Sequence, residues 1–161
     1  MEIRKAVPKD LDIILKMYEE ARRFMAENGN PNQWINGYPG EEVVQRDLEK
    51  GQLYVCQEDD EICAVFAFFT EEEPNYRVIQ DGAWLNDKPY GTVHRITSQN
   101  KRKGAASFCI DWCFAKCPNL RMDTHRDNLP MQSFLKKKGF KPCGVIQVED
   151  GSERIAFQKE A

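Results

Sequence analysis

Residues 99–114, QNKRKGAASFCIDWCF, place three cationic side chains, a glycine and two alanines directly before an apolar segment with helical character. The N–H groups in the first turn of a helix have no partner inside the helix and carry a partial positive charge, so they can bind an anion. The Gly-Ala-Ala sequence at 104–106 would let a diphosphate approach the backbone, and the Lys-Arg-Lys sequence at 101–103 adds positive charge. The alternative is a solvated basic connection before an ordinary helix. The segment matches neither the P-loop nor the G-x-G-x-x-G pattern.

The chain contains two histidines, and both fall on predicted strands. His94 lies in the middle of the β-branched segment 91–97, and His125 lies at the end of the segment 119–125. If these strands are neighbours, both rings flank one cleft, where an imidazole with an ordinary pKa of about 6.5 can act as a general base. His94 is alternatively a half-buried strand residue, and His125 alternatively organises the loop before Asn128.

Aromatic residues occur in two segments without regular periodicity. Trp34 and Tyr38 lie in a loop at 30–40 that is rich in Pro, Gly and Asn, and they either cover the core or form the wall of a ligand pocket. Trp84 and Tyr90 precede the strand that carries His94 and could line the same pocket.

The acidic residues at 71–73 are expected to be a solvated strand end, because charge runs usually face water. Their alternative role, which they would share with Asp81, is to attract a cationic substrate.

The cysteine pattern favours packing over metal binding or disulfides. Cys109, Cys113 and Cys117 recur every fourth residue, so they lie along one stripe of a helix and cannot surround a tetrahedral ion. We expect them to be buried as small hydrophobic residues. The N-terminal residues lack the apolar core of a signal peptide, and the longest apolar run, residues 62–69, is too short to span a bilayer. These features predict a cytoplasmic protein.

Length and charge limit the class of protein. A chain of 161 residues with 41% hydrophobic residues fits one domain, residues 1–161, with a sizeable core. A formal net charge of −3 argues against a general attraction to nucleic acid or to an anionic membrane.

Hydrophobic periodicity and turn residues predict the order β-α-α-β-β-β-α-β-α-β-β. The first long helix follows Asp10, the expected N-cap, and ends at Asn28-Gly29. The last two strands form a hairpin with its turn at Asp150-Gly151. Strands separated by helices can pair in parallel while the hairpins are antiparallel, so the sheet is expected to be mixed.

Two segments resemble the GNAT superfamily of N-acetyltransferases. The sequence KRKGAA resembles the R/Q-x-x-G-x-G/A signature that binds the pyrophosphate of acetyl-coenzyme A (acetyl-CoA), and NLPMQSFLKKKGF resembles the N-x-x-A-x-x-L-Y-x-x-x-G-F segment. The resemblance covers residues 1 to about 158 and implies the acyl-CoA N-acyltransferase fold. That fold is an α/β (α+β) architecture with a mixed, mostly antiparallel sheet of six to seven strands and about four helices.

The resemblance also implies a set of cofactor-binding positions. Strand residues would bind the pantetheine arm, the helix start would bind the pyrophosphate, and the asparagine would hold either group or cap its own helix. These positions are Arg95, Ile96, Thr97, Lys101, Arg102, Lys103, Gly104, Ala105, Ala106, Ser107 and Asn128.

The sequence departs from the family pattern in ways that affect the chemistry. Lys101 and Ala106 replace signature residues but still permit the anion turn. The tyrosine that often protonates the leaving thiolate falls on Leu135, so water or Tyr90 would have to supply that proton. The central strand also lacks the glutamate that serves as general base in several relatives, and His94 is the obvious replacement.

The sequence therefore predicts an enzyme that moves the acetyl group of acetyl-CoA to the amine of a small molecule or amino-acid derivative, without a metal, by direct attack in a ternary complex. The candidate catalytic residues are His94, Tyr90 and His125, and the candidate acceptor-binding residues are Trp34, Tyr38 and Trp84. The alternatives are a catalytically silent CoA-binding regulatory domain and an acetyltransferase for protein N-termini or lysines. The fold would also accommodate a homodimer.

Overall fold

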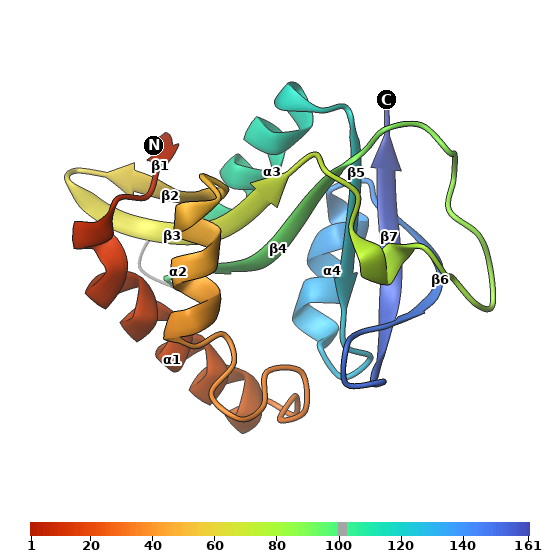
Figure 1. Ribbon diagram of the computed structural model, residues 1–161, viewed down its shortest axis with the longest axis horizontal. Helices are drawn as coiled ribbons and strands as arrows, with labels where there is room; N and C mark the ends of the chain where they lie inside the picture. Colours follow the sequence, from red (N-terminus) through yellow and green to blue (C-terminus); the bar gives the residue numbers. More distant parts are fainter. Residues whose placement is uncertain (100–102) are drawn as a thin grey trace.

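The computed structural model describes residues 1–99 and 103–161, which form a seven-stranded sheet with four α-helices (Figure 1). The strands are β1 (Glu2–Lys5), β2 (Leu53–Glu58), β3 (Glu61–Phe69), β4 (Gly91–Ser98), β5 (Asn119–Thr124), β6 (Lys141–Gln147) and β7 (Glu153–Glu160). The helices are α1 (Leu11–Glu27), α2 (Glu41–Glu49), α3 (Ala105–Lys116) and α4 (Leu129–Lys137), with short 3-10 turns at Pro8–Asp10 and Pro74–Tyr76. The predicted order and fold class are confirmed.

The sheet has the strand order β1-β2-β3-β4-β5-β7-β6. Only β4 and β5 pair in parallel among the described strands, and they pair at just two positions, Gly91 with Leu120 and Thr92 with Arg121. Beyond these pairs the two strands diverge, as Figure 1 shows for β4 and β5. The sheet is therefore split at its centre, between one half that holds β1–β4 and another that holds β5–β7.

Helices cover both faces of the sheet because alternate strand residues point to opposite sides. Val55 and Val65 pack with the apolar sides of α1 and α2, whereas Cys56 and Phe66 pack with α3 on the other face. Cys109 and Cys113 are buried in this second core, as their spacing predicts, and Cys117 packs at its edge.

Asp10 precedes α1 but does not cap it through its side chain. Its carboxylate instead accepts hydrogen bonds from the backbone N–H of Val7, at 2.8 Å, and from the guanidinium of Arg4, at 2.8 and 3.1 Å. Asp10 thus occupies the predicted N-cap position of α1, but its side chain makes no capping hydrogen bond, because a 3-10 turn places Asp10 in helical geometry before α1 begins.

The segment between β3 and β4 lies over β6 and β7. Tyr76 is buried with Cys143, Ile146 and Ala156, and Gln80 forms an isolated antiparallel bridge with Val145. This path brings residues 73–76 back toward the middle of β4, where the sheet begins to split.

Candidate functional site

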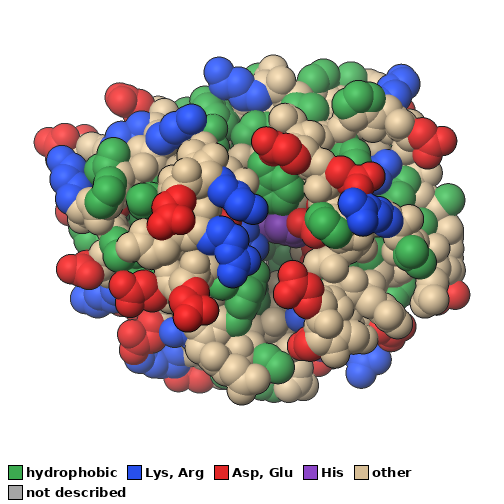
Figure 2. Space-filling view, viewed as in Figure 1, with side chains coloured by type: hydrophobic (Ala, Val, Ile, Leu, Met, Phe, Trp, Pro, Cys, Tyr) green, Lys and Arg blue, Asp and Glu red, His purple; other side chains and the backbone are tan. Residues whose placement is uncertain are grey.

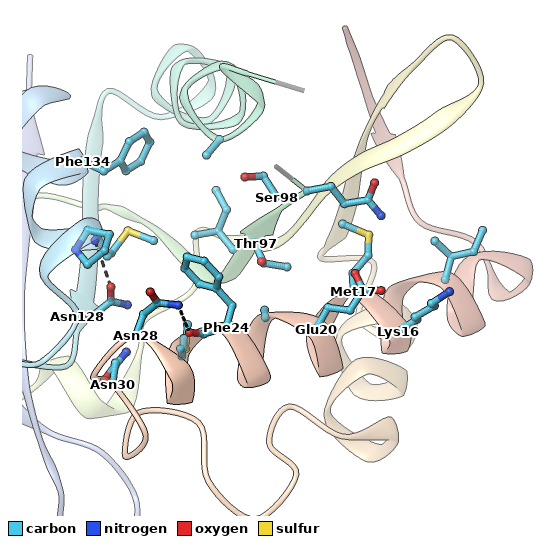
Figure 3. A pocket seen from close by; sticks show the side chains of 18 residues that line it. Lys16, Met17, Glu20, Phe24, Asn28, Asn30, Thr97, Ser98, Asn128 and Phe134 are labelled. Carbon is cyan, nitrogen blue, oxygen red and sulfur yellow. Dashed lines mark hydrogen bonds between the residues drawn. The ribbon is translucent and has the colours of Figure 1, made fainter. Parts of the chain in front are cut away.

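A cavity of about 770 Å³ lies between α1 and the first turns of α3 and α4 (Figure 3). Its walls include Ile96, Thr97 and Ala106, three of the positions assigned above to a cofactor, together with Ser98 and Gln99 at the end of β4. Apolar side chains from α1 and α4, among them Phe24 and Phe134, form opposing sides. The cavity thus joins the divergent half of β4 to two helix N-termini.

The first turn of α3 has the bare backbone that the sequence predicts. Gly104 is its N-cap and has a left-handed φ of +82°, a conformation that favours glycine. A Cβ atom at this position would meet no atom of the described residues within 4 Å, so these residues leave space beside the turn. Phe108 donates the first intrahelical N–H, to the carbonyl of Gly104, and the N–H groups of residues 105–107 precede that bond.

The side chains around this turn differ in their placement. Ala105 is buried, Lys103 is exposed, and Ser107 Oγ accepts a hydrogen bond of 2.7 Å from Lys138 Nζ. Lys101 and Arg102, which were also expected to bind the cofactor, lie outside the described residues.

Asn128 lines the cavity and also caps α4. Its Oδ1 accepts the N–H of Met131 at 3.1 Å, and its Nδ2 donates to Gln33 Oε1 at 2.9 Å. Gln33 Oε1 also accepts from Asn30 Nδ2 at 2.9 Å, which ties the loop after α1 to the start of α4. The capping role of Asn128 is observed, and its contact with a cofactor stays a prediction.

Arg95 forms a bulge in β4. Its φ is +53°, and the register with β3 shifts between Val65 and Ala67. The guanidinium makes two hydrogen bonds of 2.9 and 2.8 Å to the carboxylate of Asp47, while the carbonyl oxygen of Arg95 accepts from Tyr18 Oη at 2.8 Å. The Arg95 carbonyl therefore has a protein partner, and a contact between the backbone of Arg95 and the pantetheine arm stays a prediction.

His94 lies just where β4 and β5 separate. Its Nε2 is 2.9 Å from Glu73 Oε2, and its Nδ1 is 3.9 Å from Asp123 Oδ2. The last β4–β5 pair is Thr92 with Arg121, so His94 and Asp123 follow it at equivalent positions. The His94 side chain is 18% exposed. Figure 2 shows basic and acidic side chains gathered around the middle of the face viewed there.

Glu73 corrects the expectation of a solvated acidic strand end. Glu71 and Glu72 are exposed, but the Glu73 side chain is only 12% exposed and its Oε1 accepts the N–H of Asn75 at 3.0 Å. Burial alone would raise the pKa of Glu73, yet the hydrogen bond and charge of His94 hold that pKa below its ordinary value. The sequence gives no local signal for this contact, because the two residues are 21 positions apart.

Two tyrosines complete the surroundings of His94. Tyr76 Oη donates a 2.6 Å hydrogen bond to Asp123 Oδ2, and burial raises the pKa of this phenol well above its ordinary value. Tyr90 Oη accepts the backbone N–H of Glu73 at 3.0 Å. Tyr90, a predicted catalytic residue, therefore lies beside the backbone of Glu73, the residue whose carboxylate holds His94.

The predicted acceptor-binding aromatics fall in two places. Trp34 makes edge contacts with the rings of Tyr18 and Tyr38, with centroids 5.6 and 6.5 Å apart. Trp84 packs instead against Tyr76, and its ring lies 4.3 Å from the guanidinium carbon of Arg121. Trp34 and Trp84 thus pack against different parts of the core, and none of the three predicted acceptor-binding aromatics is among the residues that line the cavity described above.

His125 and Leu135 have contacts that are typical of structural roles. His125 is 9% exposed, its Nδ1 accepts the N–H of Asp127 at 3.0 Å, and burial, helped by the charge of Arg154, lowers its pKa. This contact organises the turn before α4. Leu135, at the family's tyrosine position, is fully buried in the core and is not among the residues that line the cavity.

In the described ranges 1–99 and 103–161, no group of three or more His, Cys, Asp or Glu residues is placed to hold a metal ion. Over the same residues, no helix has both the length and the apolar character needed to cross a membrane.

Comparison with known proteins supports the fold described above over nearly the whole length of the chain. No family model matches the sequence. A GNAT-family acetyltransferase structure from Streptococcus agalactiae is 34% identical, with a TM-score of 0.91 over 99% of this chain and 95% of that one. One from Listeria monocytogenes is 19% identical, with a TM-score of 0.72 over 99% and 94%. The uncharacterized N-acetyltransferase YesJ of Bacillus subtilis is 22% identical over 96% of this chain and 87% of its own length.

Proposed function

Because the chain belongs to the GNAT family of acetyltransferases, we propose that it transfers the acetyl group of acetyl-CoA to the amine of a small molecule or amino-acid derivative. The observation that carries this proposal is His94, held by Glu73 and facing Asp123 at the point where β4 and β5 separate. The name of the relative YesJ also supports an amine acceptor. We further propose a cytoplasmic location, because all six cysteines are free thiols, as is usual in reducing compartments.

The residues around the cavity fit acetyl-CoA. The space that the described residues leave beside Gly104 suits a pyrophosphate, and so do the first N–H groups of α3, which have no partner inside the helix. Ile96 and Thr97 line the cavity from the part of β4 that does not pair with β5, so their strand edge is available to the pantetheine amides. The cosubstrate supplies an activated thioester, whose carbonyl a backbone N–H near Ile96 would polarise.

Glu73 determines which nitrogen of His94 can act as the base. A carboxylate only accepts hydrogen bonds, so the 2.9 Å contact places the imidazole proton on Nε2. Nδ1 then presents its lone pair toward the gap in front of Asp123. An alkylammonium with a pKa of about 10 is mostly protonated at neutral pH, so it must lose a proton before it can attack.

In the proposed reaction the substrate ammonium loses two protons, one before and one during acetyl transfer. His94 Nδ1 takes one proton from the ammonium and passes it to solvent. The neutral amine then forms the new C–N bond while the C–S bond breaks, and its second proton neutralises the leaving thiolate. Leu135 cannot supply that proton, so water carries it, or Tyr90 does from beside Glu73.

The test is thiol release from acetyl-CoA with a panel of amines and amino acids, comparing His94→Ala with His125→Ala. We expect His94→Ala to lower turnover by at least about 100-fold, the scale of general base catalysis, and to keep the rise in melting temperature that acetyl-CoA produces. Glu73→Gln should also lower turnover, whereas the matched change Glu72→Gln, on an exposed neighbour, should not.

A second candidate, a catalytically silent CoA-binding domain, is favoured by the burial of Leu135 where relatives often have a catalytic tyrosine. Stabilisation by acetyl-CoA without thiol release from any amine would support this alternative. Release with peptides that carry free N-termini or lysines, but not with small amines, would instead identify a protein acetyltransferase.

A further inference from the structure

The site around His94 contains two hydrogen-bond acceptors that do not bond each other. His94 Nδ1 and Asp123 Oδ2 are 3.9 Å apart, which is too long for a direct hydrogen bond. A hydrogen bond holds each of the two side chains in place. Glu73 contacts the other nitrogen of His94, and Tyr76 Oη donates to Asp123 Oδ2 at 2.6 Å. A donor placed about 2.9 Å from both atoms would bridge the gap.

The charges beside this gap favour a cation. Glu73 and Asp123 are both carboxylates with side chains only 12% exposed. Arg95, the next residue on β4, makes two hydrogen bonds to Asp47, so its charge is balanced within that pair. An unprotonated His94 thus leaves an excess of negative charge, which a partly buried site stabilises by taking up a positive ligand.

The surroundings also favour an apolar group next to that cation. The ring of Phe69 is partly exposed and lies 5.7 Å from that of His94, so it can contact such a group. The ring of Tyr76, 5.9 Å from that of His94, is buried. A carboxylate on the carbon that carries the ammonium would enter the same small region as Glu73 and Asp123. Like charges at this separation repel in a site of low dielectric constant.

We propose that Asp123 binds the acceptor and that the acceptor is a primary alkylammonium without a carboxylate on the carbon that carries the nitrogen. This inference rests on the proposed function and narrows it, because it excludes free α-amino acids from the preferred acceptors. The ammonium donates to Asp123 Oδ2 and to His94 Nδ1, so that binding already aligns the proton that His94 removes. Tyr76 is a positioning residue, which orients the Asp123 carboxylate.

Three related probes test the substrate class. They are 2-phenylethylamine, phenylalanine amide and phenylalanine, which share an aromatic side chain and differ at the carbon next to nitrogen. Thiol release should show kcat/KM at least about tenfold higher for the first two probes than for phenylalanine. Equal or higher kcat/KM for phenylalanine would overturn the proposal and leave the acetyltransferase function intact.

Asp123→Asn tests the residue, since it keeps the shape and removes the charge. We expect KM for 2-phenylethylamine to rise about 10- to 100-fold, the scale of a hydrogen bond to a charged group, while KM for acetyl-CoA stays the same. An unchanged KM for the amine would overturn the assignment of Asp123.

Calorimetric titration of 2-phenylethylamine into the CoA-saturated protein separates this inference from catalysis. Suppose that the amine binds, that Asp123→Asn weakens this binding by at least about tenfold, and that no probe gives thiol release. That result would support the ammonium site and overturn the proposed acetyl transfer. If the protein neither binds nor acetylates 2-phenylethylamine and phenylalanine amide, the proposed acceptor class is overturned.

Discussion

Breaking the ion pair between Arg95 and Asp47 should strongly destabilise the fold, because it leaves a charge without its partner, and Asp47→Ala tests this. Asp47 is 2% exposed, and its carboxylate accepts from Arg95 Nε and Nη2 at 2.9 and 2.8 Å and from Gln52 Nε2 at 2.8 Å. Removing it leaves the guanidinium, whose side chain is 13% exposed, with the hydroxyl of Tyr38 at 3.0 Å as its remaining described side-chain partner. Breaking a buried pair in this way costs about 3–5 kcal/mol.

Urea unfolding of the wild type, Asp47→Ala and the double variant Asp47→Ala/Arg95→Met measures this cost. The double variant removes the uncompensated charge, so we expect it to be clearly more stable than Asp47→Ala alone. A loss below about 1 kcal/mol for Asp47→Ala, or a double variant no more stable than the single one, would refute the reasoning.

Asp47→Ala should also affect catalysis. Arg95 has a left-handed φ of +53°, and such a conformation in a residue other than glycine costs about 1–3 kcal/mol and persists only where its surroundings hold it. The bonds to Asp47 and the Tyr18 hydroxyl supply that restraint directly beside His94. Asp47→Ala should therefore lower kcat for thiol release at temperatures where the variant is still folded.

Other variants test the cofactor turn, the carboxylate on His94 and the buried leucine. Gly104→Glu should abolish the thermal stabilisation by acetyl-CoA, which is worth about 2.7 kcal/mol at 100 times the Kd. Gly104→Ala introduces the same backbone strain without the charge, so it should retain most of this stabilisation. Because the folded-state pKa of Glu73 is lowered, its ionisation adds stability above its unfolded pKa, and that stability is lost as the pH falls through the folded pKa. Urea unfolding of Glu73→Gln should thus lose part of its acid dependence, while Glu72→Gln should keep it. Leu135→Tyr should overpack the core, at about 1–3 kcal/mol in thermal or urea unfolding, without raising thiol release; an increase in kcat would show that the hydroxyl reaches the site.

The elements that follow from local sequence were predicted well. The apolar spacing between Leu11 and Met25 gives α1, and Asp150-Gly151 marks the turn between β6 and β7. The segment between β3 and β4 was expected to be irregular, but its course was not predictable, because its anchors are distant. Gln80 bridges to Val145, and a Cβ on Gly82 would collide with the carbonyl of Cys143.

The two halves of the candidate site differ in how far the sequence can specify them. The cofactor half depends on backbone N–H groups at a helix start, and Gly104 with the residues after it creates that geometry within a few positions. The acceptor half depends on side chains that the fold brings together, with Glu73 21 positions from His94 and Tyr76 47 positions from Asp123. No local pattern distinguishes Glu73 from its exposed neighbours Glu71 and Glu72, because the difference arises only when the segment after β3 folds back over the sheet. Sequence could therefore identify His94 as a candidate base, but only the fold shows which carboxylates orient it.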